Sequence, residues 1–177
     1  MRAGHTNAPQ ADAANHGDIL LRVPTLQDGA AVHALIEASP PLDVNSTYAY
    51  LLLCHHFADT CVVAESNGKV VGFISGYLPP AQSDTFFVWQ VAVHADARGR
   101  GLGFSMLAHL LERPAAKHVR YLDTTVSPSN QASRAMFARL ARSLETALSE
   151  SPMFGRALFG EGAGHEDEML LRIGPFH

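Results

Sequence analysis

The chain has 177 residues, of which 47% are apolar and 17% charged, so it can bury one sizeable core and is not intrinsically disordered. Its 13 Lys and Arg against 17 Asp and Glu give a net charge of −4, which disfavours binding to nucleic acid through phosphate contacts. No apolar run reaches the length of a membrane span, and the 2 cysteines cannot build a disulfide framework. We expect a soluble, cytoplasmic protein with neither nucleic acid nor membrane as a partner.

Two segments, residues 1–17 and 155–164, differ in composition from the rest of the chain. Residues 1–17 lack the apolar stretch of a signal peptide, so we interpret them as a flexible leader. No repeat or Gly/Ser linker divides residues 18–177, which predicts a single domain. The segment 155–164 carries four glycines and is interpreted as a mobile loop.

Apolar patterning, prolines and turn residues divide the domain into alternating strands and helices. Asn45 or Ser46 can cap the second helix, and Asn67-Gly68 is a pair that favours the positive φ angles of a tight hairpin. The run at 85–94 is too continuously apolar for a half-exposed strand, so we place it at the centre of the sheet. This order of elements predicts an α+β (mixed α/β) fold with a mixed sheet flanked by helices. We expect strands at 19–23, 60–65, 69–77, 85–94, 119–126 and 169–173, and helices at 26–39, 47–57, 102–113 and 130–144.

A glycine-rich turn, ARGRGLG at 97–103, follows the central strand and opens a helix. Free backbone amides at a helix N-terminus bind anions, and Arg98 and Arg100 add positive charge. The turn therefore predicts a phosphate or pyrophosphate site. It matches neither the P-loop pattern nor the dinucleotide-binding fingerprint.

This turn and the segment 122–140 resemble the two coenzyme A-contacting segments of the GNAT acetyltransferases. The resemblance rests on Arg98-x-x-Gly101-x-Gly103 after a strand ending VAV, and on a strand followed by SPSNQASRAMFARL. Four further blocks resemble the L-2,4-diaminobutyrate acetyltransferases of ectoine biosynthesis. They are PPLDVNSTYAYLLLCHHFADTC (40–61), VGFISGY (71–77), DTFFVWQVAV (84–93) and GHEDEMLLRIGPF (164–176).

The resemblance implies the GNAT fold and acetyl-CoA as co-substrate, with no metal. The backbone of Val91, Ala92 and Val93 would pair with the pantetheine arm, and an amide near Val91 would donate to the acetyl carbonyl oxygen. Asn130 would contact the coenzyme arm, cap the following helix, or do both. The pyrophosphate would lie on Arg98, Gly99, Arg100, Gly101, Leu102 and Gly103.

The resemblance also implies a substrate with two amines and one carboxylate. Asp43 would hold an ammonium group and take part in catalysis. Tyr48 and Tyr50 can offer hydroxyls, but residues two apart on a helix point to different faces, so we expect one of them at the site. Trp89 would wall the substrate or belong to the core, with Gln90 on the opposite face of its strand.

The acidic segment HEDE at 165–168 supplies the remaining candidates. His165 suits a general base, acting directly or through water. Glu166 or Glu168 would hold an amine or orient that base, and we take Glu166 as a catalytic residue and both as substrate-binding residues. The implied reaction is direct acetyl transfer to the γ-amine in a ternary complex, and a homodimer is implied as well.

Phe137 stands where many GNAT enzymes carry a tyrosine that protonates the leaving thiolate, so Ser133 or water would act instead. Two alternatives stay open: a GNAT enzyme for another small amine, and a module that binds acetyl-CoA without catalysis, which the missing tyrosine alone supports. Cys54 and Cys61, with His55 and His56, match no zinc-ligand spacing, so we interpret the two cysteines as buried thiols.

Overall fold

The computed structural model describes residues 19–160 and 164–176, so the predicted leader lies outside the described residues. The strands are β1 (Ile19–Arg22), β2 (Val62–Ser66), β3 (Lys69–Tyr77), β4 (Thr85–Val93), β5 (Tyr121–Val126), β6 (Leu148–Phe154) and β7 (Glu168–Ile173). The helices are α1 (Gly29–Glu37), α2 (Thr47–His56), α3 (Leu102–Leu111) and α4 (Gln131–Ser143). Short 3-10 turns include η1 (Leu26–Asp28), η2 (Ala58–Thr60), η3 (Ala95–Ala97), η4 (Pro114–Ala116) and η5 (Arg156–Phe159).

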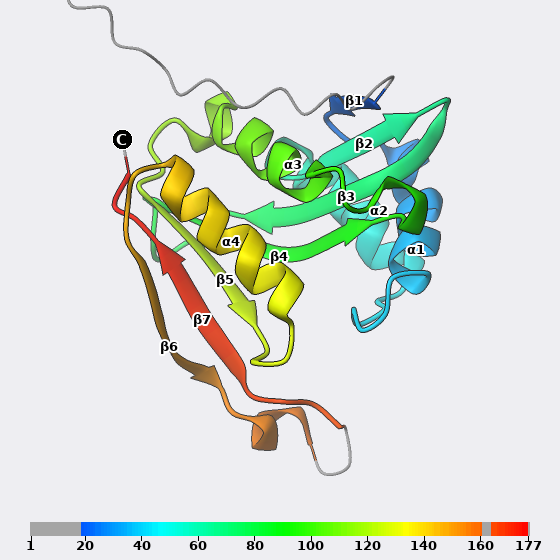
Figure 1. The fold of residues 1–177 in the computed structure, drawn as a ribbon. Helices are drawn as coiled ribbons and strands as arrows, with labels where there is room; N and C mark the ends of the chain where they lie inside the picture. Colours follow the sequence, from blue (N-terminus) through cyan, green and yellow to red (C-terminus); the bar gives the residue numbers. More distant parts are fainter. Residues whose placement is uncertain (1–18, 161–163, 177) are drawn as a thin grey trace, which may run out of the picture.

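The strands form one mixed sheet in the order β1-β2-β3-β4-β5-β7-β6 (Figure 1). The continuously apolar strand β4 lies at its centre, as predicted. Only the pairing of β4 with β5 is parallel among the described strands, and the other neighbours are antiparallel. The predicted α+β class is confirmed.

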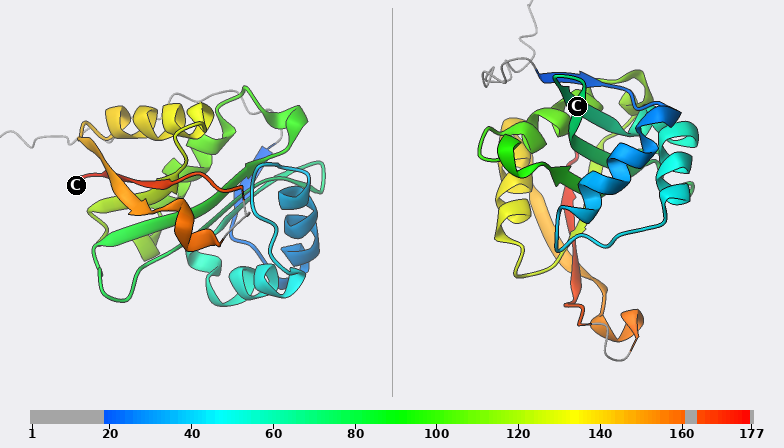
Figure 2. Two further views of the ribbon diagram at one scale, coloured as in Figure 1. Left: turned by 90° about the horizontal axis from the view of Figure 1, so that it is seen from below. Right: turned by 90° about the vertical axis from the view of Figure 1, so that its right-hand side faces the viewer.

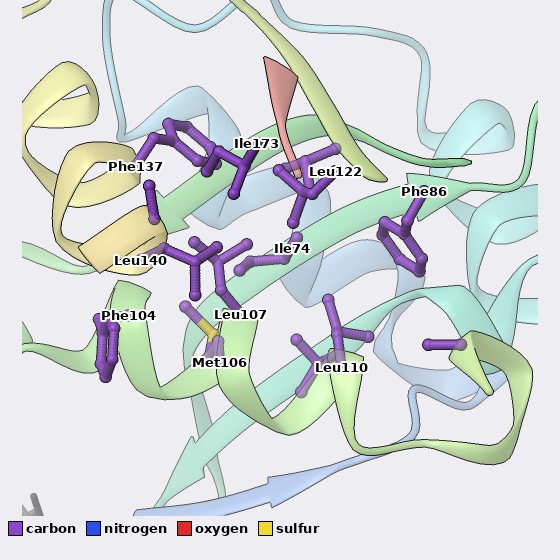
Figure 3. Close-up of a cluster of buried hydrophobic side chains, with 14 of the residues drawn as sticks. Ile74, Phe86, Phe104, Met106, Leu107, Leu110, Leu122, Phe137, Leu140 and Ile173 are labelled. Atoms are coloured by element: carbon purple, nitrogen blue, oxygen red, sulfur yellow. The ribbon is translucent and has the colours of Figure 1, made fainter. Parts of the chain in front are cut away.

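Helices cover both faces of the sheet, with α3 and α4 on one face and α1 and α2 on the other (Figure 2). Figure 3 shows Leu107 of α3 and Leu140 of α4 among the side chains packed against Ile74, Leu122 and Ile173 of the sheet. A second cluster joins α1 and α2 to the other face. Two cores thus fix the sheet from both sides, which makes its strand ends a rigid platform.

The local signals that predicted element boundaries hold in the structure. Ser46 caps α2 by accepting a hydrogen bond from the Ala49 amide at 3.3 Å. Asn67 and Gly68 have φ angles of 50° and 72°, as the tight turn between β2 and β3 requires. Because such short-range chemistry decides where an element begins, sequence reasoning located these elements well.

Strand β6 was not predicted from the sequence. It pairs with β7 at the edge of the sheet, where the hairpin reaches away from the helices (Figure 1). Its segment LSESPMF is exposed after Leu148 and includes Pro152, which lacks an amide donor. No apolar alternation marks such a strand, because neither face is buried. The expected loop 155–164 contains η5, and residues 161–163 lie outside the described residues.

Candidate active site

A β-bulge in the middle of β4 shapes the site. Gln90 pairs with Ser75 and Val88 pairs with Gly76, so Trp89 is an extra residue opposite β3. Only glycine fits at position 76, because a Cβ there would lie 2.4 Å from an atom of the Phe86 ring. One extra residue reverses the alternation of all side chains that follow.

The bulge overturns one expectation about β4. Trp89 and Gln90 were expected on opposite faces, but both line the same cavity. Before the bulge Val88 packs with α3 and α4, and after it Ala92 packs with α1 and α2. Strict alternation fails here because the inserted residue shifts the register, so the expectation for Gln90 was wrong.

The parallel pairing of β4 with β5 stops at Val88 and Thr124, although both strands continue beyond that point. A bulge increases local twist, which accounts for the divergence directly after Trp89. The backbone from Trp89 to Val93 therefore has no partner on β5. An extended ligand can pair with such a free strand edge, and this part of β4 contains the predicted pantetheine residues Val91, Ala92 and Val93.

The predicted phosphate turn has the geometry of an anion site. Gly99 and Gly101 have φ angles of 73° and 75°, and Gly101 is the N-cap of α3. The amides of Leu102, Gly103 and Phe104 belong to the first turn of α3, where the helix itself provides no acceptor, so they suit an anion. Arg98 donates from Nε to the Val93 carbonyl at 2.9 Å, which fixes the turn to the end of β4. Arg100 is exposed beside the turn, whereas Leu102 and Gly103 are buried.

Sequence reasoning missed Arg139, which lies beside the same turn. Its guanidinium lies 4.3 Å from the centre of the Phe104 ring, and its Nη1 would be 3.5 Å from a Cβ on Gly101. Helix α4 thus brings a third basic side chain to the N-terminus of α3. The sequence carried no direct signal for it, because the approach depends on how α4 packs on α3.

Asn130 caps α4 and lines the cavity at the same time. Its side-chain oxygen accepts a hydrogen bond from the Ser133 amide at 3.1 Å. The capping interpretation therefore holds, and the position beside the cavity is compatible with the coenzyme contact as well.

A cavity of about 900 Å³ adjoins the free edge of β4 and the start of α4. Its described charged residues are four acids and His165, with no Lys or Arg. Such a lining favours a ligand that carries positive charge. The acids are Asp43, Asp123, Glu166 and Glu168.

Two of the four acids already have partners. Arg172 donates to both carboxylate oxygens of Asp123, at 2.8 and 2.7 Å. Glu166 accepts from the Ser129 hydroxyl and, at 3.3 Å, from the Ser129 amide. Glu166 thus ties the segment before β7 to the loop before α4, and the structure does not place it as a free catalytic carboxylate.

The other two acids, Asp43 and Glu168, approach His165. His165 Nε2 lies 3.4 Å from Asp43 Oδ1, and its ring stacks on Phe159 with centroids 4.3 Å apart. Asp43 follows α1 and His165 precedes β7, so the fold brings together segments that are far apart in the sequence. Phe159 was missed because no periodic pattern marks η5.

Glu168 lies at the start of β7 in a half-buried position. Burial raises the pKa of its carboxyl group, while a hydrogen bond from Thr125 and the nearby His165 oppose the shift less strongly. A carboxylate with a raised pKa accepts a proton more readily than an exposed one. Glu168, rather than the Ser129-bound Glu166, is therefore the better placed of the two carboxylates to accept a proton.

The structure does not bring either candidate tyrosine into the cavity. Tyr50 is fully buried, and its hydroxyl accepts the Asn45 amide hydrogen at 3.2 Å. Tyr48 is 68% exposed on α2. The two do face different sides, as helical spacing predicts, but Tyr50 supports the loop that carries Asp43 instead of presenting its hydroxyl to a ligand.

Three further residues keep the roles that the sequence indicated. Phe137 lies on the buried face of α4, and its side chain has no proton to donate. Cys54 and Cys61 are free and buried, and burial raises their pKa values to about 11 and about 12. Thiols with such high pKa values are poor nucleophiles. Among the described residues no group of three or more His, Cys, Asp or Glu is arranged to hold a metal.

Comparison with known proteins identifies the family. The profile of the Acetyltransferase (GNAT) family matches residues 30–141. This chain belongs to the GNAT acetyltransferase family. Within the family, L-2,4-diaminobutyric acid acetyltransferase from Bordetella parapertussis is 60% identical over 88% of this GNAT chain and 84% of that protein. The Shouchella clausii protein of the same name is 48% identical over 89% of this chain and 87% of its own length.

A solved structure extends the GNAT assignment to the whole fold. Diaminobutyrate acetyltransferase EctA from Paenibacillus lautus, in complex with its substrate L-2,4-diaminobutyric acid and coenzyme A, superposes with a TM-score of 0.88. It is 43% identical, over 90% of this chain and 96% of that one. In this GNAT chain, no helix in the described ranges is long and apolar enough to cross a membrane.

Proposed function

We propose that this protein transfers the acetyl group of acetyl-CoA to the γ-amine of L-2,4-diaminobutyrate, forming N-γ-acetyl-diaminobutyrate for ectoine synthesis. The observation that carries the proposal is an acidic cavity that opens beside the free edge of β4, in a chain with the relatives described above. Two carboxylates that have no Lys or Arg partner among the described residues, on Asp43 and Glu168, suit a substrate with two amines.

The residues present fit acetyl-CoA, which supplies the acetyl group as a thioester. Gly99, Gly101 and the amides of α3 would hold the pyrophosphate, with Arg98, Arg100 and Arg139 adding positive charge. The free edge of β4 would bind the pantetheine arm by backbone hydrogen bonds. An amide near Val91 would donate to the carbonyl oxygen under attack, a contribution typically worth about 3–4 kcal/mol in the barrier.

The acidic residues would prepare the amine for attack. We assign Glu168 as the group that takes the proton from the γ-ammonium, directly or through water, because burial raises its pKa. Asp43 would hold the second ammonium group, and Trp89 would form a wall beside the substrate. His165 would orient Asp43, from which it lies 3.4 Å away. No residue is assigned as the acid for the leaving thiolate.

Substrate analogues test which groups the cavity recognises. Removing the α-amine, as in 4-aminobutyrate, is expected to lower kcat/KM at least about tenfold more than removing the carboxylate, as in propane-1,3-diamine, because the described lining is acidic. Thiol release from acetyl-CoA measures the rate, and mass spectrometry identifies the acetylated product. A larger loss for propane-1,3-diamine would contradict recognition through the amines. No thiol release with diaminobutyrate itself would refute the proposed activity.

We further infer a cytoplasmic homodimer. Free, buried cysteines suit a reducing compartment. The edge strand β6 and the following η5 expose Met153, Phe154 and Leu158, a surface that a second copy would cover. Light scattering is expected to give about twice the 19.0 kDa chain mass, and Leu158→Glu is expected to weaken the association. A wild-type monomer would rule the dimer out.

A further inference from the structure

The loop between α1 and α2 (residues 38–46) carries Asp43. The Asp43 side chain is 71% exposed, so packing alone does not set where its carboxylate lies. Beside the hydrogen bonds at its junctions with α1 and α2, the described part of the loop around Asp43 is tied to the molecule by two bonds to side chains: the Asn45 amide donates to Tyr50 Oη at 3.2 Å, and the Asp43 carbonyl accepts from Gln90 Nε2 at 2.8 Å. The second of these fixes Asp43 itself.

Gln90 reaches the loop because of the bulge in β4. Without the extra residue at Trp89, alternation would direct Gln90 to the α3–α4 face. Instead it lines the cavity, is only 3% exposed, and has its backbone amide held by Ser75 Oγ at 3.2 Å. The Gln90 side chain is thus buried and connects the central strand to the Asp43 backbone.

The orientation of the Gln90 carboxamide is determined by chemistry. A carbonyl oxygen only accepts hydrogen bonds, so the Gln90 nitrogen must face the Asp43 carbonyl. The Gln90 side-chain oxygen, the Asn45 side-chain nitrogen and the Ser39 hydroxyl are buried without a hydrogen-bond partner among the described residues. These atoms therefore add no hydrogen bond to the loop within the described part of the chain.

We propose that Gln90 is a positioning residue for the acceptor amine, acting through Asp43. By fixing the Asp43 backbone, Gln90 sets the separation between the Asp43 carboxylate and the Glu168 carboxylate across the cavity. That separation selects a substrate whose two amines are spaced to meet both acids. The inference rests on the proposed function, because it assigns the two carboxylates to the two amines.

The variant Gln90→Met keeps the length of the side chain and removes the donor. It is expected to raise KM for diaminobutyrate about tenfold, in line with one lost hydrogen bond, while KM for acetyl-CoA stays within about twofold. Thr60→Val is the matched control, because Thr60 Oγ in η2 makes a comparable buried bond, at 2.7 Å, to the carbonyl of Gly76 in β3. The control is expected to leave both KM values unchanged.

A second variant separates positioning from folding. In Gln90→Glu the ionised side chain cannot donate to the Asp43 carbonyl, whereas the protonated form can. The ratio of its KM for diaminobutyrate to that of wild type is expected to fall as the pH is lowered, which a purely structural defect would not produce.

Two results for the Gln90→Met variant would overturn the inference. One is a wild-type KM for diaminobutyrate, and the other is a parallel rise in KM for acetyl-CoA. If the ratio of the Gln90→Glu KM for diaminobutyrate to the wild-type KM did not change with pH, the inference would also be contradicted. This test still applies if Gln90→Met fails to fold. The wild-type activity is measured first. An inactive parent would refute the proposed function, whereas an active parent with unchanged KM values would refute only the role of Gln90.

Discussion

Replacing Glu168 with Gln is expected to lower kcat about 10²- to 10⁴-fold, the usual contribution of a general base. KM for acetyl-CoA is expected to stay unchanged, since Glu168 lines the acceptor cavity and lies apart from the phosphate turn. In the wild type, kcat should fall as the pH drops through the raised pKa of Glu168, because the base must be unprotonated to act. Initial rates of thiol release across pH measure both effects.

Stability provides an independent check on Glu168. Its folded-state pKa lies above the unfolded value because burial disfavours the charged form. The folded state therefore binds the proton more tightly, and stability decreases as pH rises from the unfolded pKa through the raised folded pKa. Above that range the ionised carboxylate destabilises the fold, so Glu168→Gln is expected to unfold at a higher urea concentration than wild type.

Glu166→Gln serves as the matched control for Glu168→Gln. Glu166 has the same side chain, lies two residues away and lines the same cavity, but its carboxylate is bound by Ser129. Its replacement is expected to change kcat far less. If Glu166→Gln were the more damaging of the two, or if Glu168→Gln kept wild-type kcat, Glu168 would not be the base.

The elements of this fold that the sequence predicted are those set by local chemistry. The apolar run of β4 and the start of α3 at Leu102 depend on neighbours within a few residues, and both were located correctly. The glycines of the turn before α3 were recognised in the same way, and the pyrophosphate site at this turn remains a prediction. Strand β6 was missed because it lies at the sheet edge, paired with β7, and is exposed after Leu148, which leaves no apolar pattern in its own sequence.

The details of the acceptor site depend on contacts that a linear pattern does not encode. The bulge at Trp89 lies where Gly76 closely approaches Phe86 across two strands, and it moved Gln90 to the cavity. The acidic segment 165–168 was recognised, but which carboxylate stays free depends on Ser129, 37 positions from Glu166 in the sequence. The residue types were therefore predictable, while the different contacts of Glu166 and Glu168 were not.

Asp43→Asn is expected to lower kcat/KM for diaminobutyrate about 10- to 100-fold, mainly through KM, because a neutral amide replaces the carboxylate that faces an ammonium group. The change keeps the backbone carbonyl that Gln90 holds, so it removes charge without releasing the loop. Asp167→Asn is the control, since Asp167 is exposed, binds the Arg156 amide at 2.8 Å and does not line the cavity. Wild-type kinetics in Asp43→Asn would exclude Asp43 from substrate binding.

Combining Asp43→Asn with Gln90→Met tests whether charge and position act on the same event. If Gln90 works only by placing the Asp43 carboxylate, its loss should matter little once that carboxylate is gone. The double variant is then expected to have nearly the KM of Asp43→Asn alone, a non-additivity typical of residues that act through one contact. If instead the KM increases of the two single variants multiplied in the double variant, Gln90 would influence the amine by another route. Two independent contributions to binding add in free energy and therefore multiply in KM.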